Sequence, residues 1–120
     1  MEPIIRIFEK ADDFTVYAPG QIIFRENDAG DFMYVIKAGA VDIVLHDTVV
    51  NTIGTGSVIG EMALIEDRPR SATAIANGEC QLVPVNRQRF AFLVQETPYF
   101  ALQLMSIMAS RLRRMDQRVA

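Results

Sequence analysis

Short apolar runs separated by turn-forming residues fill the chain from Phe14 to about Asn86. The runs are rich in β-branched and aromatic residues, as strands are. Pro19-Gly20, Asn27-Asp28, Gly39, His46-Asp47 and the segment 54–56 supply the turn chemistry between them. The predicted strands lie within residues 14–20, 21–24, 31–39, 40–47, 49–56, 71–78 and 80–86. Evenly spaced short strands predict an antiparallel barrel or jelly roll.

The pattern changes to a helical period at both ends of this region. Residues 1–12 predict a short helix, with Pro3 in its first turn and Ile4, Ile7 and Phe8 on one side. After Asn86, Phe90, Leu93 and Val94 recur at helical spacing until Pro98. About twenty residues without Gly or Pro then predict one long amphipathic helix.

The predicted fold is therefore mainly β with flanking α. An antiparallel barrel or jelly roll over residues 13–86 follows an N-terminal helix over 1–12 and precedes two C-terminal helices within 87–120. A chain of 120 residues is long enough for one core, so we expect a single domain over 1–120.

Composition narrows the class of protein. Half of the residues are hydrophobic and 22% are charged, which is ordinary for a globular domain, and the net charge of −3 gives no basic field for nucleic acid. Residues 79–120 are locally basic, which we interpret as a solvated helix face. One cysteine, Cys80, and one histidine, His46, allow neither an internal disulfide nor a histidine metal site. We find no signal peptide or apolar run of membrane length, so we expect a cytoplasmic protein without membrane insertion.

The candidate chemistry lies in the stretch IGEMALIEDRPRSATAIA, which begins at Ile59. Gly60 permits a tight turn and close approach of a ligand to the backbone. The following EMALI is a good former of one helical turn, whose first amides favour an anion. Arg70 adds a full charge and a planar fork that matches two phosphate oxygens.

Glu61 would repel a phosphate unless it accepts a hydrogen bond from a hydroxyl beside it. In a 3′,5′-cyclic nucleotide the only free ribose hydroxyl is the 2′-OH. The carboxylate of Glu61 would bind this one hydroxyl, and Arg70 with the backbone amides would bind the one phosphodiester. The groups in this stretch therefore match the groups of a cyclic nucleotide. A surface ion pair between Glu61 and Arg70 is the alternative, but the small residues around both side chains favour a binding site.

The stretch resembles the phosphate-binding cassette of the cyclic nucleotide-binding domain family. The family pattern, Gly-Glu-(Leu/Met)-Ala-Leu and then Pro-Arg-(Ser/Ala/Thr)-Ala, is matched here within residues 60–73. The segment PGQIIFRENDAGDFMYVIKAGAVDI is similar to the glycine-studded early strands of the family. Ile59 replaces the usual aromatic residue before Gly60, and Asn27 stands where the family often has glycine, a position at which asparagine tolerates a left-handed backbone.

The resemblance implies that the strands form an antiparallel, jelly-roll-like β-roll that holds the nucleotide, and it implies which residues bind this ligand. Glu61 would accept the ribose 2′-OH, Arg70 would bind the cyclic phosphate, and Ser71 would donate to the phosphate or the base. Backbone amides near Met62, Ala63 and Ala72 would complete the phosphate cradle beside Gly60. The ligand would be cAMP, with cGMP as the alternative, and no catalytic or metal-binding residue and no cofactor are implied.

The long C-terminal helix has two further faces of interest. One face carries Leu104, Ile107, Arg111 and Arg114, and the resemblance implies that Arg111 caps the purine as part of a lid. A second face alternates at four and three residues and suits packing on the roll or a homodimer through this helix. It consists of Ala101, Met105, Met108, Leu112, Met115 and Val119.

Other functions fit the sequence less well. A cupin-type metalloenzyme needs a histidine cluster, and hydrolysis of the nucleotide needs a metal site or a placed base. The chain ends at Ala120, after the long helix, so we expect no helix-turn-helix domain and no binding of nucleic acid. We expect a non-catalytic sensor that acts on an unknown effector protein; an interaction module of the same fold that has lost its ligand remains the alternative.

Overall fold

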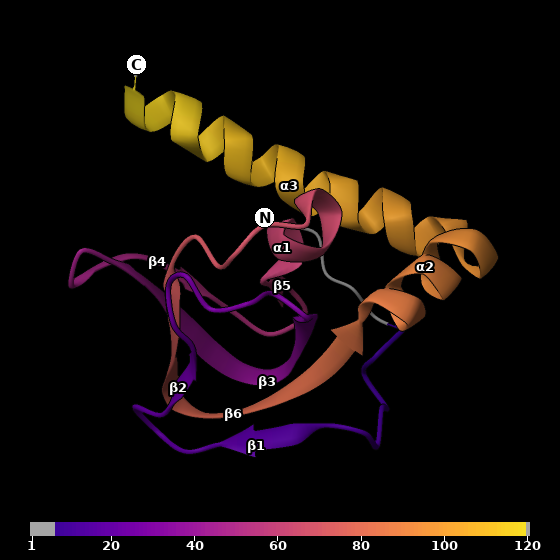
Figure 1. The fold of residues 1–120 in the computed structure, drawn as a ribbon, viewed down its shortest axis with the longest axis horizontal. Coiled ribbons are helices and arrows are strands. Elements are labelled where there is room, and N and C mark those ends of the chain that lie inside the picture. Colours follow the sequence, from indigo (N-terminus) through magenta and orange to yellow (C-terminus); the bar gives the residue numbers. More distant parts are fainter. Residues whose placement is uncertain (1–6, 120) are drawn as a thin grey trace.

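A computed structural model describes residues 7–119, with side chains up to Met115. It contains a six-stranded antiparallel sheet and three helices (Figure 1). In chain order the elements are β1 (Thr15–Tyr17), β2 (Ile22–Phe24), β3 (Phe32–Leu45), β4 (Thr48–Ile53), β5 (Val58–Ile59), α1 (Glu61–Glu66), β6 (Thr73–Asn86), α2 (Arg87–Glu96) and α3 (Pro98–Val119). The predicted class, mainly β with flanking helices, is confirmed.

Two long strands, β3 and β6, form the centre of the roll. They pair antiparallel from Phe32 opposite Asn86 to Val44 opposite Thr73. β1 and β2 pair with β6, while β4 and β5 pair with β3. All four shorter strands are therefore attached to the central pair. Figure 1 shows both long strands strongly curved, with α3 running along one side of the roll past α1.

The expected turn at Gly39 is wrong, because β3 continues through this residue. Gly39 has a φ of 98°, and the register between β3 and β6 shifts on both sides of Ala38, which marks a β-bulge. A Cβ at Gly39 would lie 2.6 Å from Cys80 Cβ, so glycine is required for close strand approach. The runs expected as separate strands at 71–78 and 80–86 likewise merge into β6 through Gly78. Glycine here bends the sheet instead of ending a strand.

The turn at His46-Asp47 is confirmed. Both residues have positive φ, 51° and 61°, as a two-residue type I′ hairpin requires. It joins β3 to β4, with Leu45 opposite Thr48. Asn27 also has the left-handed backbone expected for it, with a φ of 73°.

The predicted N-terminal helix is not seen in the part of it that the structure describes. Residues 7–10 form a turn, in which Ala11 N–H donates to the Phe8 carbonyl, and residues 1–6 lie outside the described range. Tertiary contacts fix this segment. Phe8 is buried edge-to-face against Phe100 of α3, with ring centroids 6.4 Å apart. Burial of one aromatic residue outweighs the weak local preference for helix.

Two apolar clusters make up the core. The first joins one end of the roll to α1 and α3, and it includes Val35, Leu64, Phe100, Leu104 and Ile107. The second lies between the strands and includes residues such as Ile36, Val41 and Leu82. The two predicted C-terminal helices are confirmed, with the break at Thr97. The helix face with Leu104 and Ile107 is the one that packs on the roll. The face with Met105, Leu112 and Met115, for which packing on the roll was one of two expectations, is exposed instead.

Candidate functional site

One cavity of about 560 Å³ opens between the roll, α1 and α3. Its lining comes from strands β2, β3 and β4, from the segment between β5 and β6, and from α3. All of the predicted site residues line this cavity: Gly60, Glu61, Met62, Ala63, Arg70, Ser71, Ala72 and Arg111. The fold therefore brings together residues that are 51 positions apart in the chain, from Gly60 to Arg111.

Gly60 shapes the start of the site. It is the N-cap of α1, with a left-handed φ of 75°, which favours glycine. A Cβ on Gly60 would lie 2.3 Å from Arg70 Nη1, so the missing side chain also makes room for this guanidinium. Sequence reasoning assigned the glycine to close approach of a ligand. The structure adds that Arg70 itself needs the space.

Arg70 is buried and held from several sides. Its Nη1 donates to the Gly60 carbonyl at 3.0 Å, its Nη2 donates to the Phe32 carbonyl, and its Cζ lies 4.1 Å from the centre of the Phe24 ring. The backbone of Arg70 is also fixed, because Arg70 N–H donates to the Asp28 carbonyl and the Arg70 carbonyl accepts from Asn27 N–H.

Burial lowers the pKa of Arg70 by desolvation, and nearby groups that include Asp31, Asp28 and Glu61 partly oppose this. Within the described residues, Arg70 Nε is buried without a hydrogen-bond partner. A buried donor without a partner is costly, by about 1–3 kcal/mol. An anionic ligand in the cavity would offset the desolvated charge of Arg70.

Glu61, the first residue of α1, is buried and ion-paired with Arg111 of α3. Arg111 Nη1 lies 2.7 Å from Glu61 Oε1. Arg111 Nη2 also donates to Ser57 Oγ at 3.0 Å and to the Val58 carbonyl at 2.6 Å. Arg111 thus binds the carboxylate and the strand beside it. Stacking on a purine, as the family resemblance implies, would require these bonds to break.

The other predicted residues are placed around this pair. Ala63 is buried within α1, whereas the Met62 side chain is exposed. Ser71 is exposed and Ala72 is half-buried on the way into β6, and both border the cavity. These positions suit the roles expected for their amides and for the Ser71 hydroxyl, and those roles remain predictions.

Sequence reasoning missed two kinds of residue at this site. The Phe24 ring packs against the Arg70 guanidinium, and Ser57 Oγ accepts a hydrogen bond from Arg111. These contacts can be recognised only from the tertiary structure. Gly30 and Arg87 lie on the outer side of α1. A Cβ on Gly30 would lie 2.1 Å from Ala63 Cβ. The glycine after Asp28-Ala29 was a sequence signal, since close packing of backbone on a helix requires such a residue.

The described residues contain neither a cluster of metal-binding side chains nor a helix that could span a membrane. Within residues 7–115, whose side chains are described, no group of three or more His, Cys, Asp or Glu is placed to hold a metal ion. No helix within residues 7–119 combines the length and the apolar character needed to cross a membrane.

Known proteins resemble this chain in sequence. A family model described as the cyclic nucleotide-binding domain matches residues 14–97. The cAMP-dependent protein kinase regulatory subunit of Eremothecium gossypii is 45% identical over 71 residues, which make up 59% of this chain and 16% of that protein. The cGMP-dependent protein kinase of Plasmodium berghei is 40% identical over 60 residues, or 50% of this chain and 7% of that protein.

The fold is similar to solved structures as well. The crystal structure of Thermus thermophilus catabolite activator protein matches with a TM-score of 0.77 at 29% identity, over 88% of this chain and 52% of that one. The chain therefore spans about half of this relative and a much smaller share of the two kinase proteins.

Proposed function

The chain belongs to the cyclic nucleotide-binding domain family, and we propose that its cavity binds a 3′,5′-cyclic purine nucleotide, with cAMP preferred and cGMP as the alternative. One observation carries this proposal. Glu61 and Arg70 are both buried in the wall of the same cavity, where the carboxylate can accept a hydrogen bond from a ribose hydroxyl and the guanidinium can bind an anionic phosphate.

In the proposed pose, Arg70 binds the cyclic phosphate. Its desolvated charge at the cavity wall favours an anion at this point. The amides of Met62, Ala63 and Ala72 complete the cradle, and Ser71 donates to the phosphate or the base. The cavity volume of about 560 Å³ lies within the usual range for small-molecule sites.

Glu61 accepts the ribose 2′-OH in this pose. A carboxylate has two oxygens and about four acceptor positions. Arg111 occupies Oε1, which leaves Oε2 for the hydroxyl, so the arginine and the ribose can bind the same carboxylate together. Arg111 then orients Glu61 for the ligand instead of stacking on the purine.

We propose a regulatory and non-catalytic role for the bound nucleotide. The E. gossypii relative is named as a regulatory subunit of a cAMP-dependent kinase, which supports a sensor acting on an effector protein. The P. berghei relative is named as a cGMP-dependent kinase, so relatives named for both nucleotides match and cGMP stays the alternative. Neither hydrolysis of the ligand nor binding of DNA is expected. A cytoplasmic location also stays a prediction.

A homodimer through α3 is part of the same proposal. Met105, Leu112 and Met115 follow the four-three alternation predicted from the sequence, and all three are exposed by more than half. An apolar stripe of this spacing suits a second copy of the helix in a coiled coil. Sedimentation over a range of concentrations tests it, and a strictly monomeric protein would contradict it.

The binding proposal is tested by calorimetric titration with cAMP, cGMP and 2′-deoxy-cAMP. We expect the deoxy analogue to bind about 1–3 kcal/mol more weakly than cAMP, because it leaves a buried carboxylate short of a partner. Glu61→Gln should narrow this gap, whereas Glu96→Gln, an exposed carboxylate on α2, should not change it. Equal wild-type affinity for cAMP and its deoxy analogue would remove Glu61 from the site.

A further inference from the structure

One polar residue of β4 lies in an otherwise apolar part of the inner face of the roll. Asn51 lies opposite Ile43 of β3, which in turn lies opposite Ala74 of β6. The next row on the same face is apolar and buried in the second core cluster, and it consists of Ile53, Val41 and Ala76. Asn51 is half-buried on this face and lines the cavity. An apolar side chain would suit this position, so the carboxamide favours a polar partner in the cavity.

A β-bulge turns this part of β4 toward the cavity. The register with β3 shifts by one residue between Asn51 and Val49, so Val50 is an additional residue on β4. Side chains alternate between the two faces of a regular strand, yet Val50 and Asn51 both line the cavity. Bulges redirect side chains in this way next to binding sites. The bulge therefore places an apolar side chain directly beside the carboxamide.

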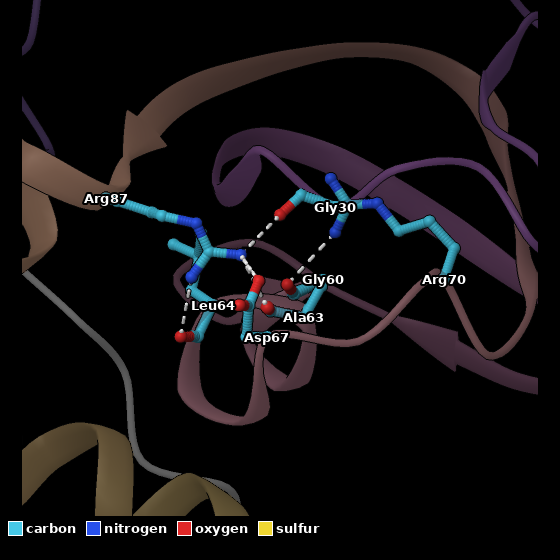
Figure 2. Close-up of polar contacts among 7 residues, drawn as sticks. All are labelled: Gly30, Gly60, Ala63, Leu64, Asp67, Arg70 and Arg87. Carbon is cyan, nitrogen blue, oxygen red and sulfur yellow. Dashed lines mark hydrogen bonds and ion pairs between the residues drawn. The ribbon is translucent and has the colours of Figure 1, made fainter.

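The phosphate end of the cavity is fixed at the cassette. Figure 2 shows Arg70 on the Gly60 carbonyl at the start of α1 and Arg87 on the Ala63 and Leu64 carbonyls at its end. The short helix is thus held at both ends by guanidinium groups. A phosphate bound at Arg70 would therefore have a defined position, from which the ribose and the base extend into the rest of the cavity.

Asn51 lies at a suitable distance from the cassette to contact the base. Ala74 follows the cassette residue Ala72 by two positions and lies two strands away from Asn51. Neighbouring strands are about 4.8 Å apart, so this separation is about 10 Å. A nucleotide whose phosphate binds at the cassette can span it with its ribose and base. The wall beside Asn51 is apolar at Ile43 and Val50, which suits the face of a purine.

The side chain of Asn51 is the only carboxamide among the described residues that line the cavity. Carboxylates in the lining accept hydrogen bonds and guanidinium groups donate them, whereas a carboxamide does both in one plane. Asn51 Oδ1 accepts a hydrogen bond from Thr52 N–H at 2.9 Å, which orients the amide. Oδ1 keeps a second lone pair and Nδ2 has two donor hydrogens, so the group can still bind a ligand through both atoms.

We propose that Asn51 contacts the base and selects adenine over guanine, an inference that rests on the proposed cyclic-nucleotide function. Asn51 Nδ2 donates to adenine N7, and Oδ1 accepts from the N6 amino group, which is the bidentate pairing of asparagine with this edge. Guanine presents two acceptors, O6 and N7, on the same edge. Oδ1 would face one of these acceptors whichever way the amide is turned. The preference for cAMP over cGMP then depends on a residue of the roll outside the cassette.

The test compares cAMP, cGMP and 7-deaza-cAMP, in which a C–H group replaces N7, by calorimetric titration. Wild type should bind cAMP about 5- to 150-fold more tightly than cGMP, the range for one bidentate base contact. It should bind 7-deaza-cAMP at least about fivefold more weakly than cAMP, because Nδ2 loses its acceptor. Asn51→Leu, which suits the apolar row, should bind all three ligands within about threefold of one another.

A matched control separates base selection from a general effect on the fold. Asn77 donates to Asp42 and does not line the cavity, so Asn77→Leu should keep the wild-type preferences among the three ligands. A loss of stability would weaken all three ligands alike and leave the ratios of their affinities unchanged. The ratios therefore report the contact with the base itself.

The outcomes distinguish this inference from the binding proposal. A wild-type protein that binds no cyclic nucleotide contradicts the proposed function. Wild type that prefers cGMP, or that binds cAMP and 7-deaza-cAMP equally, overturns the role of Asn51 and leaves binding intact. These two results need no variant, so they do not depend on the folding of Asn51→Leu. An Asn51→Leu protein that keeps the wild-type preference for cAMP would overturn the role as well.

Discussion

Arg70 and Arg111 line the same cavity from two different regions, the β-roll and α3, and the two regions are held in different ways. Arg70 is fixed by two backbone hydrogen bonds, two carbonyl acceptors and an aromatic ring, all from the roll and the cassette. Arg111 is the last half-buried residue of α3 before a run of exposed ones, and its described bonds go from one side chain to Glu61, Ser57 and Val58.

This difference indicates which wall can adjust to a ligand. Moving Arg70 would disrupt backbone pairing between the cassette and the loop before β3. Moving the Arg111 side chain would break its bonds to Glu61, Ser57 and the Val58 carbonyl but would leave backbone pairing in the roll intact. The roll therefore provides a preformed half of the site, and the far half of α3 is the part that a ligand or a partner can reposition.

The largest effect on cAMP affinity should come from a substitution in the wall of the cavity that the β-roll forms. Arg70→Ala should weaken cAMP binding by about 2–5 kcal/mol, the range for truncating one side of a buried charged contact. That corresponds to about 30-fold to a few thousand-fold in affinity. Arg25→Ala, an exposed arginine on the roll outside the cavity, is the control for a change in net charge. Calorimetric titration measures both, and wild-type affinity in Arg70→Ala would refute the cassette assignment.

The attachment of α3 to the roll should give the next largest effect. Ile107 is fully buried in the first core cluster, so Ile107→Ala should lower the free energy of unfolding by about 2–4 kcal/mol. Met105 lies on the same helix but is 59% exposed. Met105→Ala should therefore change the free energy of unfolding by no more than about 0.5 kcal/mol.

Urea denaturation at low protein concentration measures both variants of α3. Similar losses in the two would show that the outer face of the helix is buried in solution. That result would favour self-association and contradict the packing difference between the two faces.

The smallest effect should come from the α3 wall of the cavity. Arg111→Ala leaves Glu61 buried without its cation, but Arg111 is itself partly exposed, so the loss in cAMP affinity should be about 1–3 kcal/mol. This is about 5- to 150-fold. Arg113→Ala, on the exposed side of α3, is the matched control. An Arg111→Ala loss as large as that of Arg70→Ala would contradict the proposed difference between the walls.

Local sequence was sufficient for much of the fold and for the centre of the site. Strand-forming runs, the type I′ turn at His46-Asp47, the one-turn helix after Gly60 and the break at Pro98 are all set by near neighbours in the chain. Glu61 and Arg70 could be selected together because they lie within one short cassette whose chemistry matches one ligand. Their burial in one cavity is consistent with that selection, and binding itself remains to be tested.

Other features depended on contacts that a linear reading cannot supply. Gly39 resembles a turn residue in sequence, but pairing with β6 makes it a bulge within a long strand. The N-terminal segment was expected to be helical. Its described residues instead form a turn, because Phe8 packs on Phe100, 92 positions later.

The sequence alone therefore determined the cassette, the strand-rich body and the helical end, since each depends on interactions over a few residues. Only the tertiary structure decided that Arg111 binds Glu61 and that Arg87 holds the end of α1. These two contacts join residues 50 and 23 or more positions apart. An arginine on a helix surface has the same local pattern whether it points to solvent, to a purine or to a buried carboxylate. Its partner is fixed by how the helix packs on the roll, and that packing is a property of the whole core.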